Sequence, residues 1–190
     1  MARIKAPVVQ NPELLDRIIG AIQRGLVENI GWLDVAFGRA ERLVKMSPNG
    51  RRIYTPNVYA GGNEYTEVTP DANIGNFSFF WIDDPQRVDV VRNVSISIDA
   101  TFSLIVWFDF RKVLDEGRNK EQVKRELLDV LNGGFRLPEG RITINKVYEL
   151  AENIYRGFTL DEIDNQFLMH PYGGFRFEGE LQITETCLVK

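Results

Sequence analysis

Histidine and cysteine are almost absent from this 190-residue sequence, which contains one of each, His170 and Cys187. A single cysteine cannot form an internal disulfide, which favours a reducing compartment or a particle assembled inside a cell. One histidine cannot build a histidine-rich zinc site, and with the cysteine remote in sequence it makes a poor Cys–His pair. We therefore expect no metal and no cofactor, and we interpret Cys187 as a small apolar side chain and His170 as a surface or loop-packing imidazole.

The glycine-rich sequences that bind phosphate groups are absent too, since neither G-x-x-x-x-G-K-[ST] nor G-x-G-x-x-G occurs. The acidic residues do offer one pair on a common face of a predicted strand, Glu178 and Glu180. Such a pair leaves open a cation site or a divergent hydrolase, although a solvated acidic face explains it better. We expect that the protein is not an enzyme.

Neither an excess of positive charge nor a long apolar run is present. The formal net charge of −4 argues against a module that binds nucleic acid by neutralising phosphates. No apolar run approaches the roughly 20 residues of a membrane helix, so we expect a soluble protein with no membrane partner. The length predicts one domain over residues 1–190.

The strongest pattern that is present runs from Val94 to Phe110. Every even-numbered position in this stretch is apolar, and the odd-numbered positions carry serine, threonine or aspartate, except Ile105 and Trp107. This period of two predicts a β-strand with one buried face. At about 3.3 Å per residue the strand would span roughly 55 Å, well beyond the usual length.

A second alternating stretch, Phe175 to Cys187, has the same period, so we predict that it pairs antiparallel with the long strand. Two helices are predicted to cover the apolar face of this pair. The first begins at Asn11-Pro12 and ends near Gly31, and the second begins at Asn119, where Gln122 completes a capping box. The serine, threonine and aspartate face is left with nothing to cover it.

The remaining segments give weaker signals. Residues 45–75 are rich in glycine, proline and asparagine and predict a loop-rich insertion, which includes a strand that Pro56 must end or leave at an edge. Residues 77–82 predict an aromatic strand with side chains on both faces, and residues 147–156 predict a third helical stretch. The predicted fold class is α+β, a mainly antiparallel sheet with a very long central strand (about 94–110) packed on two or three helices.

This order of elements, ending in P-Y-G-G-F-R-F-E-G-E-L-Q-I at residues 171–183, resembles that of tail terminator and neck proteins of tailed bacteriophages. The likeness covers about residues 12–187 and is one of element order and strand patterning. It implies a tail-terminator-like fold and a structural virion protein that forms a ring at the head–tail junction or the top of the tail tube. The chain is longer than typical terminators, mainly through residues 32–75, which leaves a terminator, a stopper-like connector and another neck ring all open.

The same resemblance implies the partners and the location. The partners would be copies of the chain in a hexamer or dodecamer, head-side connector or portal-associated proteins, the tail tube protein, and DNA that passes without specific binding. The protein would be found in the virion, after assembly in the cytoplasm of the bacterial host. Ring contacts would be made by aromatic residues, arginines and the two apolar interruptions of the long strand: Trp32, Phe37, Arg51, Arg52, Tyr59, Tyr65, Ile105 and Trp107.

A second hypothesis comes from the aromatic residues between positions 57 and 81. A soluble cytoplasmic module could bind a ligand there, for example a carbohydrate, if Tyr59, Tyr65 and Trp81 line one closed pocket. Burial of the same residues between subunits would favour the ring instead.

Overall fold

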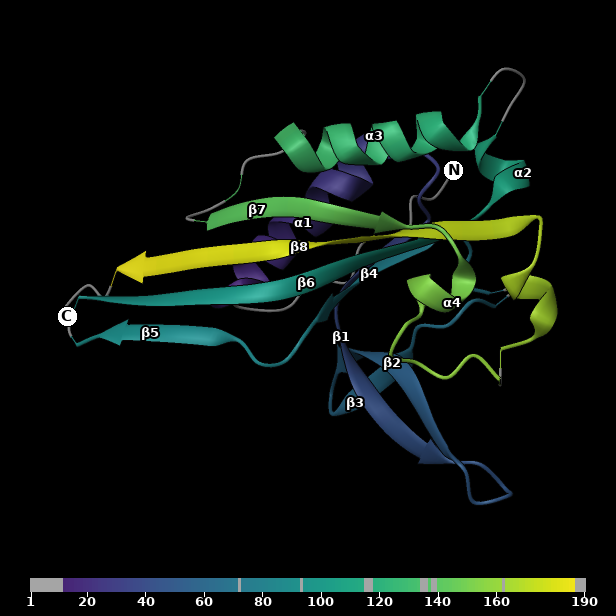
Figure 1. Ribbon diagram of the computed structural model, residues 1–190, viewed down its shortest axis with the longest axis horizontal. Coiled ribbons are helices and arrows are strands. Elements are labelled where there is room, and N and C mark those ends of the chain that lie inside the picture. Colours follow the sequence, from purple (N-terminus) through teal and green to yellow (C-terminus); the bar gives the residue numbers. More distant parts are fainter. Residues whose placement is uncertain are drawn as a thin grey trace.

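The computed structural model describes residues 12–71, 73–92, 94–114, 118–133, 137, 140–161 and 163–186. These residues form one eight-stranded sheet in the order β3-β2-β1-β4-β6-β8-β7, with β5 paired to β6 (Figure 1). Only β1 and β4 pair parallel, so the sheet is mixed and mostly antiparallel, and the α+β class is confirmed. The elements are α1 (Leu15–Asn29), β1 (Val35–Met46), β2 (Arg52–Gly61), β3 (Glu64–Glu67), β4 (Phe77–Ile82), β5 (Arg87–Val91), β6 (Ser95–Asp109), α2 (Phe110–Val113), α3 (Lys120–Gly133), β7 (Gly140–Tyr148), α4 (Ala151–Ile154), the 3-10 helix η1 (Asn165–Leu168) and β8 (Tyr172–Thr186).

The long central strand is confirmed as β6, which has 15 residues. It pairs antiparallel with β8 over its whole length, from Ser95 opposite Thr186 to Asp109 opposite Tyr172, as the matching periods predicted. The strand ends where α2 begins, because the Asp109 carboxylate accepts a hydrogen bond from the backbone N–H of Arg111 and caps that helix.

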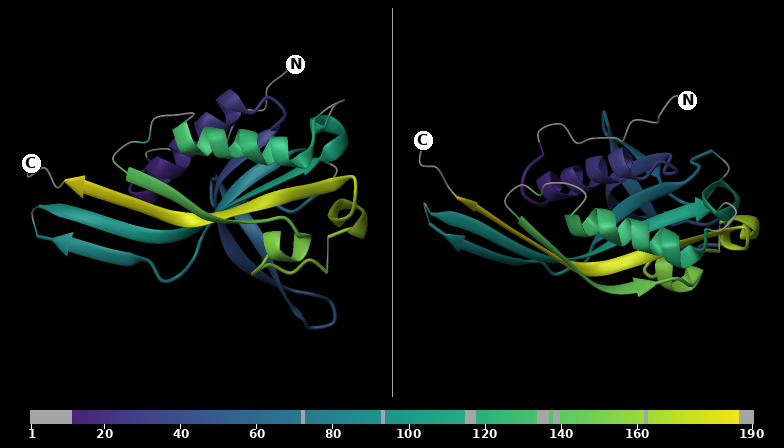
Figure 2. Two further views of the ribbon diagram at one scale, coloured as in Figure 1. Left: turned by 45° about the horizontal axis from the view of Figure 1, so that its top comes forward. Right: turned by 90° about the horizontal axis from the view of Figure 1, so that it is seen from above.

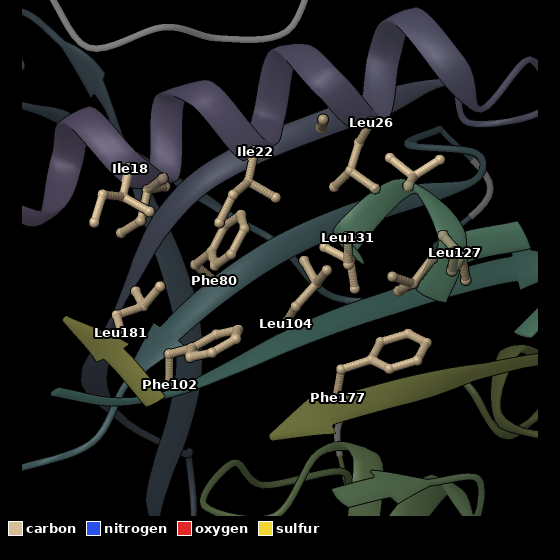
Figure 3. Packing of buried hydrophobic residues seen from close by; sticks show 14 of the residues in the cluster. Ile18, Ile22, Leu26, Phe80, Phe102, Leu104, Leu127, Leu131, Phe177 and Leu181 are labelled. Atoms are coloured by element: carbon tan, nitrogen blue, oxygen red, sulfur yellow. The ribbon is translucent and has the colours of Figure 1, made fainter. Parts of the chain in front are cut away.

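Helices α1 and α3 cover the apolar face of β6 and β8, as expected. Figure 3 shows Ile18, Ile22 and Leu26 of α1 pointing toward Phe80 and Leu104 on the sheet. Helix α1 begins at Leu15 rather than at Pro12, and the predicted cap Asn11 lies outside the described residues. Burial of this apolar stripe is the main reason that the helix forms on the sheet.

The capping box of α3 is confirmed. The Asn119 backbone N–H donates to Gln122 Oε1 at 2.8 Å, and the Gln122 N–H donates to Asn119 Oδ1 at 3.1 Å. Two free N–H groups at the helix start are thereby bonded, which explains why the helix begins here.

The segment predicted as a loop-rich insertion contains the end of β1 and all of β2 and β3, so it belongs to the sheet more fully than the sequence indicated. Strand β1 pairs with β2 over seven residue pairs, and β3 extends the same sheet. Pro56 stays inside β2 because its carbonyl accepts a bond from the Val68 N–H on the β3 side. In a strand the N–H and C=O of one residue point to the same side, so the N–H that Pro56 lacks would also point toward β3. Strand β3 ends at Glu67, so the position opposite Pro56 lies just beyond it and no bond of the strand pair is lost.

The predicted third helix over residues 147–156 was also wrong in extent. Strand β7 continues to Tyr148, and α4 covers only Ala151–Ile154. Val147 and Tyr148 pair with Phe177 and Arg176 of β8, so a neighbouring strand decides the conformation of residues that also fit a helical pattern.

A second hydrophobic core covers part of the face that was expected to stay free. Val35, Phe77, Phe79, Ile154 and Tyr155 pack together with further residues there, which are Phe37, Ala40, Val58, Val68, Ile105 and Trp107. On the outer half of this face, Ser95, Ser97 and Asp99 of β6 are half-buried and Thr101 is exposed. In Figure 2 this half of the sheet extends beyond the helices.

Candidate interaction surfaces

Two residues predicted to mark a subunit contact, Ile105 and Trp107, lie inside the second core and are 0% and 2% exposed. The Trp107 ring lies edge-on to the ring of Tyr155 at 5.3 Å between centroids. Because their own chain covers them, the assignment of Ile105 and Trp107 to a subunit interface was wrong. The covering residues Ile154 and Tyr155, with Phe158 packed beside them, lie far away in sequence, so the pattern of the strand alone cannot predict them.

Phe37 and Trp32 are also engaged within the chain. Phe37 is buried, and its ring lies 6.4 Å from that of Phe77. Trp32 is half-buried, with its ring 5.1 Å from Phe108, and its Nε1 donates to Glu126 Oε2 at 2.9 Å. Phe37 is therefore excluded from a surface role, whereas Trp32 joins the loop after α1 to α3 and leaves only part of its ring accessible.

The other four predicted residues are exposed and lie on the β1–β2–β3 hairpins. Arg51 forms an ion pair with Asp161, and Arg52 begins β2. Tyr59 and Tyr65 lie opposite each other on β2 and β3, with their rings edge-on at 5.4 Å. They do not share one face: Arg52 lies on the side of β2 that carries Val58, whereas Tyr59 and Tyr65 lie on the other side, at the far end of the strand. Their exposure is compatible with the predicted role.

The three aromatics of the ligand-binding hypothesis do not meet. Val58, Ala40 and Trp81 are neighbours across β2, β1 and β4, so they share one face of the sheet. Tyr59 follows Val58 and therefore points to the opposite face, together with Tyr65. The Trp81 ring instead lies against Phe158 at 5.0 Å.

The largest exposed apolar group was not among the predicted residues. We call β5, residues 95–101 of β6 and residues 180–186 of β8 the arm. Val88, Val90 and Val91 of β5 are 57%, 62% and 49% exposed, and Val94, just before β6, is 54% exposed. Val88 and Val90 lie on the apolar face of the arm, whereas Val91 pairs with Ser95 and lies on the polar face. The run Arg87–Val91 alternates over too few residues to predict a strand; it becomes one because β6 provides its hydrogen-bond partners.

The opposite face of the arm is polar. Ser97 Oγ and Thr184 Oγ1 lie 3.0 Å apart across β6 and β8, and Asp99, Thr101 and Glu180 continue the same face. This part of the sequence-based expectation, a long strand with an uncovered hydroxyl and carboxylate face, is confirmed for the arm alone.

Farther along the same face, Arg176 and Glu178 of β8 are buried, although the sequence left this face with nothing to cover it. Glu178 Oε1 accepts a 2.6 Å bond from Arg156 Nη2 and lies 3.0 Å from Arg176 Nε. Arg176 Nη1 donates to the carbonyls of Ile154 and Arg156. Burial lowers the pKa of Arg176, and the Glu178 charge opposes that shift. This ionic cluster fastens the α4 segment to the sheet and engages the carboxylate that a hydrolase would need.

The cavities are small or open. One of about 40 Å³ lies beside Trp107, Asp109 and Lys112 and has room for about one water molecule. The other described depression lies between Asn29 of α1 and Arg125 of α3 and is open to solvent. Within the described residues no three His, Cys, Asp or Glu side chains gather as a metal site, and no helix is long and apolar enough to cross a membrane.

No protein-family model matches the sequence, and no curated protein matches it as a relative. The likeness to tail terminators therefore rests on element order and strand patterning.

Proposed function

We propose that the chain is a structural virion protein that forms a ring of six or twelve copies at the head–tail junction, or at the top of the tail tube, of a tailed bacteriophage. The observation that carries this proposal is the arm, because Val88 and Val90 of its outer strand are exposed on the face that continues the apolar core. Exposed apolar groups that extend an apolar sheet face are typical of a surface that a partner covers.

The charge of the chain also supports a ring around DNA. A net charge of −4 suits a lumen through which DNA passes without binding, since phosphates are repelled rather than neutralised. In this proposal the exposed tyrosine pair Tyr59 and Tyr65 of β2 and β3 contacts the head-side connector or the tail tube protein, because tyrosine is common in such contacts.

The proposal is tested by negative-stain microscopy and mass photometry of the purified protein, alone and with purified tail tubes and connectors. Rings of six or twelve copies, free or at one end of a tube, are the expected result. A strictly monomeric protein that also binds neither the connector nor the tail tube would overturn the proposal.

The ligand-binding hypothesis receives no support from the positions of its aromatics, since Tyr59 and Tyr65 lie on the opposite sheet face from Trp81. A cavity of about 40 Å³ is also far too small for a carbohydrate. A carbohydrate that binds the protein and quenches Trp81 fluorescence would revive this hypothesis.

A further inference from the structure

Strands β5 and β7 form open edges on opposite sides of the sheet around β6 and β8 (Figure 1). Among the described residues, β5 pairs only with β6, and β7 pairs only with β8. An edge strand presents a row of unpaired N–H and C=O groups that another strand can bind. The chain therefore carries two places where a strand of another molecule can be added.

The apolar residues of the two edges lie on the same face of the sheet. Val88 and Val90 of β5 stand opposite Ile98 and Ile96 of β6, which are on the face that α1 and α3 cover. Ile142 and Ile144 of β7 pack against that same core. If β5 and β7 were neighbours, their apolar side chains would form one continuous surface.

The charges and directions of the two edges also match. On the polar face, β5 carries Asp89 and β7 carries Arg141, both exposed. Each neighbouring pair in the series β5, β6, β8 and β7 is antiparallel, so β5 and β7 run in opposite directions. A copy placed beside the first in the same orientation thus presents its β5 antiparallel to β7.

The lengths of the two edge segments that could pair also agree. Strand β5 has five residues. The regular pairing of β7 with β8 breaks between Ile144 and Lys146, which leaves Gly140–Ile144 as a regular segment of similar length. A bulge of this kind ends a ladder and bends the strand away.

We propose that β5 of one copy pairs antiparallel with β7 of the next, with Val88 opposite Ile144 and Val90 opposite Ile142. This assignment rests on the proposed ring, to which it adds the contact between subunits. The register puts Asp89 opposite Thr143 and diagonal to Arg141, within reach of an ion pair.

The contact is head-to-tail, because it joins two different edges, and such contacts close into rings. Val90 lies four residues farther out along the sheet than Ile142, a displacement of about 13 Å per copy along the strand direction. The strands of a closed ring are therefore inclined to its axis, as strands are in a barrel.

Cysteine crosslinking tests the pairing. In a Cys187→Ser background, Val90→Cys and Ile142→Cys proteins are made separately, mixed, and treated with bismaleimidoethane under conditions where rings form. We expect a covalent dimer from the mixture and none from either protein alone, and a ladder up to the ring size when one chain carries both substitutions. Val44→Cys replaces Val90→Cys in the control, because Val44 is also exposed but lies on the β1–β2 hairpin, and it gives no dimer.

A charge exchange supplies a second readout. Asp89→Arg weakens assembly about tenfold, and adding Arg141→Asp restores it. Asp84→Arg, an exposed change outside both edges, leaves assembly unchanged.

The outcomes separate this inference from the proposed function. Rings that form without crosslinking Val90→Cys to Ile142→Cys would overturn the edge pairing and leave the ring in place. Self-crosslinking of Val90→Cys alone would show a two-fold contact between β5 strands and would also overturn the pairing. If no oligomer forms, alone or on tail tubes, both the pairing and the ring are wrong.

Discussion

Replacing Glu178 by Gln removes the negative charge between two arginines and leaves the shape of the side chain nearly unchanged. The side chains of Glu178 and Arg176 are 9% and 2% exposed, whereas that of Arg156 is 57% exposed. The loss of Glu178 therefore leaves Arg176 as a buried cation with only two carbonyls as partners. Breaking a buried ion pair in this way costs about 3–5 kcal/mol.

The exposed Arg156 contributes less to this loss of stability. The Arg156–Glu178 bond is screened by water on the arginine side, so it is worth about 0–1 kcal/mol. For a domain of this size, about 2–4 °C in melting temperature corresponds to each kcal/mol, so Glu178→Gln should lower it by roughly 6–20 °C. Thermal and urea unfolding followed by circular dichroism measure the change.

Glu180→Gln is the matched control, because Glu180 lies on the same strand and the same face but is exposed. Its effect should stay within about 0.5 kcal/mol. A double variant, Arg176→Met with Glu178→Gln, should be more stable than Glu178→Gln alone, since it contains no buried charge. The coupling of Arg176 to Glu178 is refuted if Glu178→Gln melts within about 2 °C of the natural protein. It is also refuted if the stability loss of the double variant equals the sum of the losses of Glu178→Gln and of Arg176→Met measured alone.

Three further predictions concern single residues. Tyr155→Phe removes a buried hydroxyl that has no hydrogen-bond partner within the described residues, and should raise the free energy of unfolding by about 1 kcal/mol. Burial raises the pKa of Tyr155 well above its ordinary value, so above about pH 10 this tyrosine ionises in the unfolded state but not in the folded state, and the natural protein loses stability. Urea unfolding at about pH 8 and about pH 10.5 measures this loss, which should be smaller in Tyr155→Phe. Equal losses in the two proteins would contradict this. Hydrogen bonds from Arg111 lower the pKa of Asp109, so the ionised carboxylate stabilises the fold above about pH 4 and this stabilisation is lost in more acidic solution. In Asp109→Asn the free energy of unfolding should therefore fall less between about pH 5 and 2.5 than in the natural protein. An equal fall in both proteins would refute this. In Gly179→Ala the new Cβ would meet the Thr143 carbonyl, so the variant should lose about 1–3 kcal/mol and its β7 amides should exchange hydrogen faster, whereas Gly133→Ala, with open space around it, serves as the control; equal stability of the two would contradict the clash.

The elements that sequence analysis predicted well are those whose signals are local. The alternation from Val94 to Phe110 predicts β6, which covers Ser95–Asp109, because every second side chain of a strand points to the same face. The capping box of α3 is predicted by two residues three apart, Asn119 and Gln122, whose bonds form within the helix itself. The pairing of β6 with β8 followed from two stretches with the same period.

The elements that it predicted poorly depend on contacts between distant segments. Strands β1 and β2 lack a clear period over most of their length, and they form because they pair with each other and with β4 and β3 on either side. The same holds for the proposed contact residues. The strand pattern predicted that Trp107 is exposed, and no strand was predicted at Val90, whereas Trp107 is buried and Val90 is exposed.

The sequence by itself therefore determined the long strand, its partner and the helices over its apolar face, because periodicity and capping are properties of neighbouring residues. Only the tertiary structure decided which parts of the polar face are covered. The segment around Tyr155 and the Arg176–Glu178 pair covers the inner half, whereas the outer half from Ser95 to Thr101 is not part of the second core. The burial of a side chain depends on every segment that lies over it, and those segments are here more than 40 positions away from Trp107.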